Sequence, residues 1–144
     1  MVLHPYDFKS IVPTVSWTVL FHDEFDREYR PLAKGLQDEL LAHALLLSQF
    51  GPGLGRPTVD TLKGSKHANM KELRFGWQGE VWRVAFAFDP DRQAILLVGG
   101  DKGGADQKQF YKRIIGLADA RFDMHLASLA AASARKEKRH AKKS

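Results

Sequence analysis

The chain has 144 residues, of which 44% are hydrophobic and 27% charged, and its formal net charge is +5. This length and composition predict one globular domain with a modest core. The sequence contains no cysteine, which excludes disulfides and thiolate metal sites, and no apolar run approaches the roughly 20 residues of a membrane span. No basic, apolar leader opens the sequence, so we expect a cytoplasmic protein without a membrane partner.

Positive charge gathers in two parts of the sequence. Residues 134–144 hold six Lys or Arg against one Glu, and residues 60–113 hold ten basic against seven acidic side chains. Residues 1–59 are mildly acidic, with five basic side chains against seven acidic ones. This distribution makes nucleic acid a reasonable partner, although a basic tail often serves solubility alone.

The first half of the sequence predicts a strand followed by two helices. The first ten residues look irregular, and apolar alternation over residues 15–21 indicates a strand. A helix begins near Asp23, with acidic residues in its first turn, and is interrupted at Pro31. A second helix ends at Gly51 and carries one apolar stripe, made of Leu36, Leu40, Ala44 and Leu47.

A glycine-rich segment, residues 51–70, predicts a loop. Its Gly-x-Gly-x-Gly pattern resembles a phosphate-binding loop. However, it follows a helix and opens none, whereas such a loop needs a strand before it and a helix after it. We therefore expect no phosphate cradle here.

The stretch KELRFGWQGEVWRVAFAFD, residues 71–89, predicts a half-buried β-hairpin with a two-residue Gln-Gly turn. That turn pairs Phe75 with Trp82 in the core, pairs Arg74 with Arg83 on the opposite face, and leaves Trp77 exposed at the tip. Like charges directly opposite each other destabilise a sheet. An anionic ligand is the simplest reason for such a pair.

The last part of the sequence predicts a central strand and a long helix. Residues 93–100 include a continuous apolar run, which is typical of burial on both faces. A helix then runs from Asp106 to about Leu129 on an apolar stripe made of Phe110, Ile114, Leu117 and Ala118. The predicted fold is α+β with a small antiparallel sheet, in the order strand, two helices, three-stranded meander and C-terminal helix. We expect one domain over residues 1–130 and a basic, disordered tail over residues 131–144.

Four segments, LKGSKHANMKELRF, EVWRVAFAFD, AILLVGGDKGG and QFYKRIIGLADAR, resemble the RelE/ParE superfamily of toxins from type II toxin–antitoxin modules. The similarity is greatest to the HigB-type, phage-derived branch. The shared features are a Leu-Lys-Gly loop, an ELR strand, an aromatic-Arg strand start, a strand ending in Gly-x-Lys and a helix with aromatic-Lys-Arg. The resemblance covers residues 17–121.

The resemblance implies a compact α+β fold and an antitoxin partner, which often carries a helix-turn-helix DNA-binding domain. RelE- and HigB-like members cleave mRNA in the ribosomal A site, whereas ParE-like members poison DNA gyrase. We therefore expect a metal-independent endoribonuclease that acts with the ribosome on mRNA and needs no cofactor. The alternatives are a gyrase-inhibiting toxin and a catalytically inactive RNA-binding member.

The resemblance also implies site residues. In the mRNA-cutting members, basic residues hold the scissile phosphate, and the matching positions here are Arg74, Arg83 and Lys102, with Tyr111 as a looser match. Glu72 stands where the RelE pattern has a lysine. Guanidinium groups suit phosphate because they donate two parallel hydrogen bonds, and neighbouring positive charge favours a lysine that acts as a base. The structural alternative is that Arg74 pairs with a nearby glutamate and that Tyr111 packs in the core.

Further candidates come from the residue types alone. His67 lies in the loop before the hairpin and suits a general acid or base, although a loop histidine is more often simply exposed. The six histidines show no metal-ligand spacing, so no metal site is predicted. Basic side chains that could contact RNA or belong to a solvated surface are Lys66, Lys71, Lys108, Lys112 and Arg113.

Overall fold

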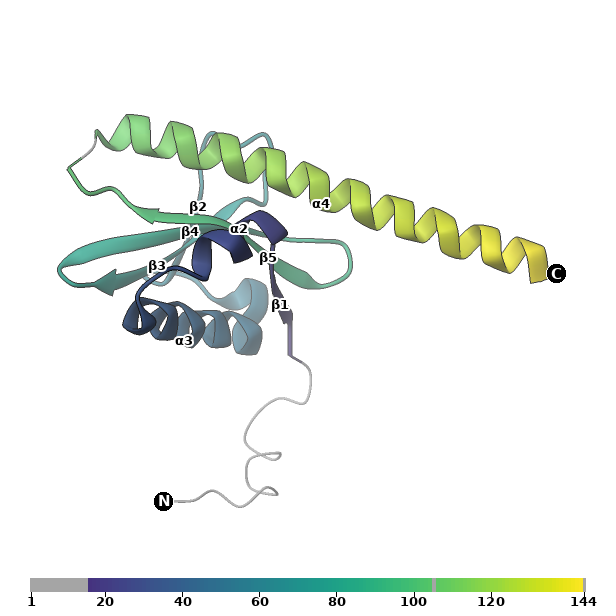
Figure 1. The fold of residues 1–144 in the computed structure, drawn as a ribbon, viewed down its shortest axis with the longest axis horizontal. Helices are drawn as coiled ribbons and strands as arrows, with labels where there is room; N and C mark the ends of the chain where they lie inside the picture. The colour runs from purple at the N-terminus through teal and green to yellow at the C-terminus, as the bar shows by residue number, and fades with distance from the viewer. Residues whose placement is uncertain (1–15, 105, 144) are drawn as a thin grey trace, which may run out of the picture.

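A five-stranded sheet forms the middle of the computed structural model, which describes residues 16–104 and 106–143 (Figure 1). The strands lie in the order β1-β5-β4-β3-β2, with helices on both faces, and this confirms the predicted α+β class. The elements in chain order are β1 (Thr18–Phe21), α2 (Asp23–Tyr29), α3 (Lys34–Phe50), the 3-10 turn η1 (Gly51–Gly53), β2 (Val59–Thr61), β3 (Lys71–Trp77), β4 (Glu80–Phe88), β5 (Gln93–Asp101) and α4 (Gln107–Lys143).

The prediction of an antiparallel sheet was wrong for β1, which pairs in parallel with β5, while the β2–β3, β3–β4 and β4–β5 pairs are antiparallel. The long connection between β1 and β5 allows the parallel pairing, which a tight hairpin does not. The predicted meander is present, but β2 adds a strand within the segment predicted to be a loop. Its three residues are too few to show alternation, and the strand is defined by its pairing with β3. The first strand begins at Thr18, and the predicted start at Val15 and the irregular first ten residues lie outside the described residues.

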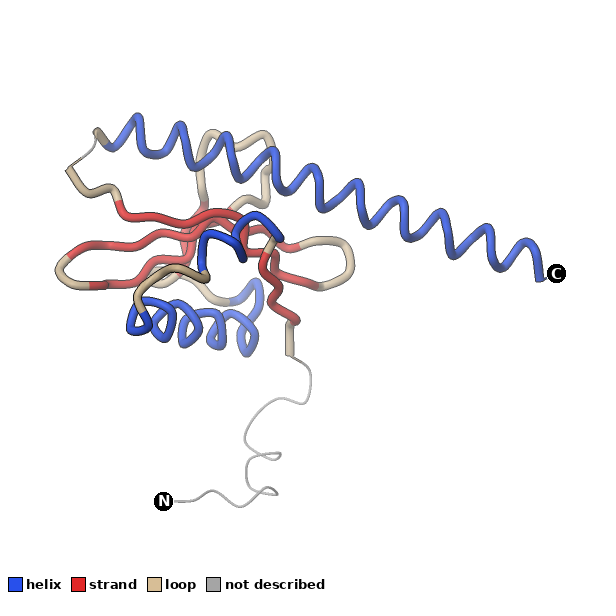
Figure 2. Tube along the Cα trace, viewed as in Figure 1, coloured by secondary structure: helices blue, strands red, loops and turns tan. Residues whose placement is uncertain are grey.

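Both faces of the sheet are buried against helices, and Figure 2 shows α3 and α4 on opposite sides. On one face, the predicted stripe of α3 packs against residues such as Leu73, Phe75 and Val84. On the other face, α4 packs against residues such as Ala85 and Ile95. The hairpin is therefore covered on two sides, and the prediction of a single buried face was wrong because it ignored α4.

The β3–β4 hairpin has the predicted two-residue turn. Gln78 has φ 48° and Gly79 has φ 79°, the left-handed backbone of the turn type that suits a twisted hairpin. The resulting register pairs Phe75 with Trp82, as predicted. Trp77 is not the exposed tip that we expected, since its ring packs over Gly35 and against the α3-side core.

A β-bulge in the β4–β5 pair places Leu97. Phe86 pairs with Leu96 and Ala85 with Val98, so the register skips Leu97. Leu97 and Val98 consequently both belong to the core beneath α4, whereas strict alternation would separate them. The apolar run of this strand is continuous because both of its faces are buried, as predicted, and the bulge adds Val98 to the same side as Leu97.

Helix α4 is longer than predicted. Its packed stripe includes Phe110, Ile114, Ala118 and Phe122, but the helix continues to Lys143 through the segment expected to be a disordered tail. The side chains of residues 133–142 are exposed. That segment is rich in Ala, Lys and Arg, which are strong helix formers, and it extends a helix whose nucleation is already complete. Among the described residues, no helix is long and apolar enough to cross a membrane.

Candidate nucleic-acid interface

Arg74 and Arg83 lie directly opposite each other on the α4 side of the hairpin. They are register partners in the β3–β4 pair. The Arg83 guanidinium carbon lies 5.7 Å from the centre of the Tyr111 ring, and Arg74 Nε lies 3.7 Å from Glu72 Oε1. The apolar neighbours in each strand point to α3 instead. Two guanidinium groups therefore share one face, as the sequence predicts.

Glu72 lies beneath this pair and connects it to α4. The residue is 6% exposed, and the Tyr111 hydroxyl donates a hydrogen bond of 3.2 Å to Glu72 Oε1. Burial raises the pKa of the Glu72 carboxyl, while Tyr111 and the two arginines oppose that rise. Burial and the neighbouring Glu72 raise the pKa of the Tyr111 phenol. This raised pKa keeps Tyr111 protonated at neutral pH.

The first turns of α4 bring a third guanidinium to the same place. The Phe110 ring has Arg83 at 5.9 Å and Arg113 at 6.0 Å from its centre. Arg113 also approaches Gly100, the register partner of Arg83 in β5. Aromatic faces attract cations, so the ring of Phe110 holds two like charges near each other. We call the set Glu72, Arg74, Arg83, Tyr111 and Arg113 the arginine face.

Polar atoms of the arginine face have unused hydrogen-bonding capacity. Within the described residues, the buried atoms Arg74 Nε, Arg83 Nε and Glu72 Oε2 have no hydrogen-bond partner. The Arg83 side chain is held by one hydrogen bond of 3.2 Å to the Val81 carbonyl. Buried polar groups are normally satisfied. Arg74 and Arg83 are half-buried, so an anion would meet the exposed part of each guanidinium group, while the buried Nε donors stay unpaired.

Lys102 lies at the edge of the arginine face. It directly follows β5 and is two residues beyond Gly100, the partner of Arg83. Lys71 lies on the other face of the sheet from Arg74, because the two are three positions apart in β3 and side chains alternate between the faces of a strand. Its register partner is Phe86, which packs on the α3 side. Lys108 and Lys112 are exposed on the first turns of α4, beside the arginine face.

His67 and Lys66 lie far from the arginines, at the middle of α4. His67 Nε2 is 2.8 Å from Asp123 Oδ1, and Lys66 pairs with the same carboxylate. Asp123 follows Tyr111 by twelve residues, which is about 18 Å along a helix. The structure therefore does not bring His67 to the predicted phosphate site. Its contacts fasten the loop to α4 instead.

Residues that the sequence analysis did not single out organise this surface. Asp119 accepts hydrogen bonds from the Ser65 hydroxyl and the Lys66 amide, and together with Asp123 it holds the loop. Arg121 is buried and donates to the Leu97 carbonyl and to Glu28. The sequence signal for these two anchors is their spacing, because residues four positions apart lie on one face of a helix.

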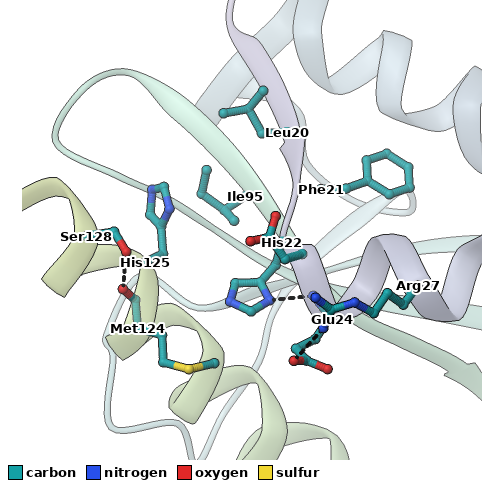
Figure 3. Close-up of a pocket in the computed structure, with 10 residues that line it drawn as sticks. Leu20, Phe21, His22, Glu24, Arg27, Ile95, Met124, His125 and Ser128 are labelled. Atoms are coloured by element: carbon teal, nitrogen blue, oxygen red, sulfur yellow. Dashed lines mark hydrogen bonds and ion pairs between the residues drawn. The ribbon is translucent and has the colours of Figure 1, made fainter. Parts of the chain in front are cut away.

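A separate cavity of about 440 Å³ lies between β1, the start of α2 and α4 (Figure 3). Figure 3 shows His22 and His125 on its wall, with Leu20 and Met124 among the apolar lining residues. His22 Nδ1 accepts the Glu24 amide, and His125 Nε2 lies 2.7 Å from Asp89 Oδ2. The predicted site residues do not line this cavity, which is therefore distinct from the arginine face.

A known protein family matches most of this chain. The family model described as "Phage derived protein Gp49-like" matches residues 27–123, more than half of the chain. The match includes the whole arginine face and ends at Asp123, before the exposed part of α4. It confirms the predicted resemblance to the phage-derived branch.

Two curated relatives come from Mycobacterium tuberculosis (strain ATCC 25618 / H37Rv). The putative toxin HigB2 is 50% identical over 96 residues, which cover 65% of this chain and 47% of that protein. The putative toxin HigB3 is 53% identical over 83 residues, which cover 58% of this chain and 70% of that protein. The chain thus spans about half the length of the first relative.

Two solved toxin structures are similar in shape. A mutant of the E. coli toxin RelE in the free state has a TM-score of 0.49 at 10% identity, covering 69% of this chain and 94% of that one. The RelBE2 toxin–antitoxin complex from M. tuberculosis has a TM-score of 0.47 at 17% identity, covering 62% and 95%. Both TM-scores lie below 0.5, so these structures carry no argument about function.

Proposed function

We propose a function from one premise, that the chain belongs to the phage-derived Gp49-like family and is similar to putative HigB toxins. It is the toxin of a type II toxin–antitoxin module. Its activity is the cleavage of mRNA on the ribosome, without a metal ion, by attack of a 2′-hydroxyl on the adjacent phosphate. The arginine face is its active site.

The observation that carries this proposal is the in-register arginine pair, whose two guanidinium groups are half-buried on one face of the sheet. Cleavage adds negative charge to a five-coordinate phosphate. Guanidinium groups stay charged at all relevant pH values and donate paired hydrogen bonds to phosphate oxygens. Preorganised donors of this kind often account for the largest part of catalysis, at about 100-fold or more per donor. Arg74 and Arg83 supply them from rigid strands.

Proton transfer follows from the contact between Tyr111 and Glu72. The 2′-hydroxyl gives its proton to the Tyr111 oxygen as it attacks phosphorus, and Tyr111 passes its own proton to the Glu72 carboxylate. The raised pKa of Glu72 makes it a better base than a solvated glutamate. The bond between phosphorus and the 5′-oxygen breaks, and that oxygen takes a proton from Lys102. The products are a 2′,3′-cyclic phosphate and a 5′-hydroxyl.

The partners in this proposal are the ribosome with its bound mRNA and a cognate antitoxin. The similarity to putative HigB toxins supports an antitoxin, often a helix-turn-helix protein, encoded by a neighbouring open reading frame. Co-expression of that product should neutralise the toxin. An adjacent gene whose product neither binds the chain nor restores growth would contradict this part of the proposal.

The experiment compares induced wild-type protein with Arg83→Ala in a bacterial host, with mRNA ends mapped by primer extension. Wild type should cut translated mRNA, and Arg83→Ala should abolish the cuts while its circular dichroism stays unchanged. Arg92→Ala is the matched control: Arg92 also lies over an aromatic ring, 4.5 Å from the centre of Trp17, but follows β4 at the opposite end of the sheet. It should cut like wild type.

The alternatives give different results in the same cells. Intact mRNA together with DNA damage indicates a gyrase-inhibiting toxin, and intact mRNA without DNA damage indicates an inactive binding protein. Digestion of free RNA in the absence of ribosomes would show that the protein is a nuclease that does not depend on the ribosome. Equal loss of cleavage in Arg83→Ala and Arg92→Ala would assign no special role to the arginine face.

A further inference from the structure

The end of α4 carries a stripe of positive charge that the proposed active site does not use. At about 100° per residue, Arg135, Lys138, Arg139 and Lys142 fall within roughly 100° of one another around the helix axis. All four side chains are exposed. We call these four residues the basic stripe. Lys136 lies beside the stripe, so basic side chains gather on less than half of the helix circumference.

The opposite side of this helix segment lacks large apolar side chains. On the same helical count it presents Ser133, Glu137, His140 and Ala141. A helix that lies in a membrane surface needs large apolar side chains such as Trp, Phe or Leu opposite its basic face. This segment has none there, so a lipid surface is a poor match. A partner that is recognised through its negative charge alone fits this segment better than a lipid surface does.

The basic stripe is held away from the body by a continuous helix. Phe122 is the last residue of α4 that is buried in the core, and Arg135 follows about 20 Å further along the helix axis. Figure 1 shows this end of α4 projecting beyond the sheet. The stripe also lies beyond Asp123, where the family match ends. It thus lies outside the matched range, on a continuous helix that also carries Tyr111 and Arg113 of the arginine face.

We infer that the basic stripe binds the phosphate backbone of a folded RNA. Four exposed cations along about 11 Å of helix match the dense negative charge of a nucleic-acid backbone, and such contacts need no base sequence. The inference goes beyond the proposed cleavage and rests on it only for the choice of RNA over DNA. On the ribosome, the stripe would hold ribosomal RNA while the arginine face holds the message.

The test measures binding to an RNA hairpin with a stem of about 16 base pairs, the length that a double-stranded RNA-binding domain spans. All proteins carry Arg83→Ala, which protects the RNA from cleavage. The test variant adds Arg135→Gln, Lys138→Gln, Arg139→Gln and Lys142→Gln, which preserve helix propensity. The slope of log affinity against log salt should fall in magnitude by about 3 to 4, at about 0.9 per phosphate lost. From 50 to 200 mM salt, the variant should therefore lose about 100-fold less affinity.

Two controls separate this local effect from net charge and from unfolding. Replacing Arg30, Lys34, Arg56 and Lys63 by Gln removes the same charge from exposed sites outside α4. The slope of log affinity against log salt should then stay close to that of the protein with an intact basic stripe. Arg135→Lys with Arg139→Lys keeps the charge and should keep the affinity. Circular dichroism at 222 nm confirms that the helix is retained in each protein.

Several outcomes would overturn the inference. These are an unchanged slope in the stripe variant, an equal loss in the control with four substitutions elsewhere, or tighter binding to anionic vesicles than to RNA. More than tenfold tighter binding to duplex DNA would overturn the assignment to RNA. Because binding is measured in a non-cleaving background, failure here leaves the cleavage proposal standing. Absence of cleavage by wild type leaves this binding result intact.

Discussion

Arg121 fastens α4 to the sheet, and its replacement should destabilise the whole domain. Its side chain is 9% exposed and makes three hydrogen bonds. Nη1 donates to the Leu97 carbonyl at 2.8 Å and to Glu28 Oε1 at 2.8 Å, and Nη2 donates to Glu28 Oε2 at 2.7 Å. Leu97 is the residue that the β-bulge leaves without a partner in β4. Arg121 therefore donates a hydrogen bond to the backbone at the bulge, where the register of the β4–β5 pair is interrupted.

Arg121→Met keeps the apolar stem and removes the donors. A buried carbonyl that loses its partner costs about 1–3 kcal/mol. The pair with Glu28 adds at most about 1 kcal/mol, because the Glu28 side chain is 47% exposed and solvent screens the attraction. We expect the free energy of unfolding to fall by about 3 kcal/mol and the melting temperature by about 10 °C.

Urea denaturation followed by circular dichroism measures this change, with Glu28→Gln as the matched control. The control removes the charge pair and leaves the carbonyl satisfied, so it should cost about 1 kcal/mol or less. A loss below 1 kcal/mol for Arg121→Met would refute the reasoning. So would equal losses for the two variants, since the ion pair and not the carbonyl would then dominate.

Three further predictions concern proton transfer and pH. Tyr111→Phe keeps the ring beside Arg83 but removes the relay, so single-turnover cleavage should fall about 100-fold or more with under about 1 kcal/mol lost in stability; undiminished cleavage would exclude the relay. Burial raises the Glu72 pKa, so wild-type cleavage should decline as the pH falls through a value above 4.5. Cleavage by Glu72→Gln should not show this decline at low pH. A pH profile identical to that of wild type would contradict the role of Glu72 as the base. For Asp89, burial opposes ionisation, but hydrogen bonds from His125, Gln93 and backbone amides outweigh it and lower the pKa below 3.8. Its stabilising effect is complete above 3.8 and is lost as the pH falls towards the folded-state pKa. Asp89→Asn should therefore destabilise the protein to urea at pH 7 and much less at pH 2, whereas an equal loss at both values would contradict the shift.

The sequence predicts the parts of this fold that depend on local pattern. The stripe of α3, the Gln78-Gly79 turn and the register of Arg74 with Arg83 follow from periodicity and turn chemistry, and all three are present. The strand β2 depends on pairing with a distant segment, and the β5 bulge depends on packing of Leu97 against α4. Such non-local contacts leave little trace in a short window of sequence.

The sequence predicts only the part of the arginine face that lies within the hairpin, because its other members come from distant parts of the chain. Alternation places Arg74 and Arg83 together, but it does not say that α4 returns over them with Tyr111 and Arg113. His67 was proposed from its chemistry alone, and the partner that fixes it, Asp123, lies 56 positions away in the sequence. The tail has too few apolar side chains to pack, which predicts disorder, but its residues have high intrinsic helix propensity and continue α4.

The alternation within the hairpin limits how this protein can diverge. In β3, Arg74 sits between Leu73 and Phe75, which pack under α3, so a shift of one residue would exchange the two sets of side chains. Insertion or deletion of a single residue in either strand would drive guanidinium groups into hydrocarbon and lift aromatic rings into water. Changes in target preference should therefore arise by substitution, or by altered length in the loops that flank the hairpin. A one-residue insertion or deletion within the paired strands of the hairpin should not be tolerated.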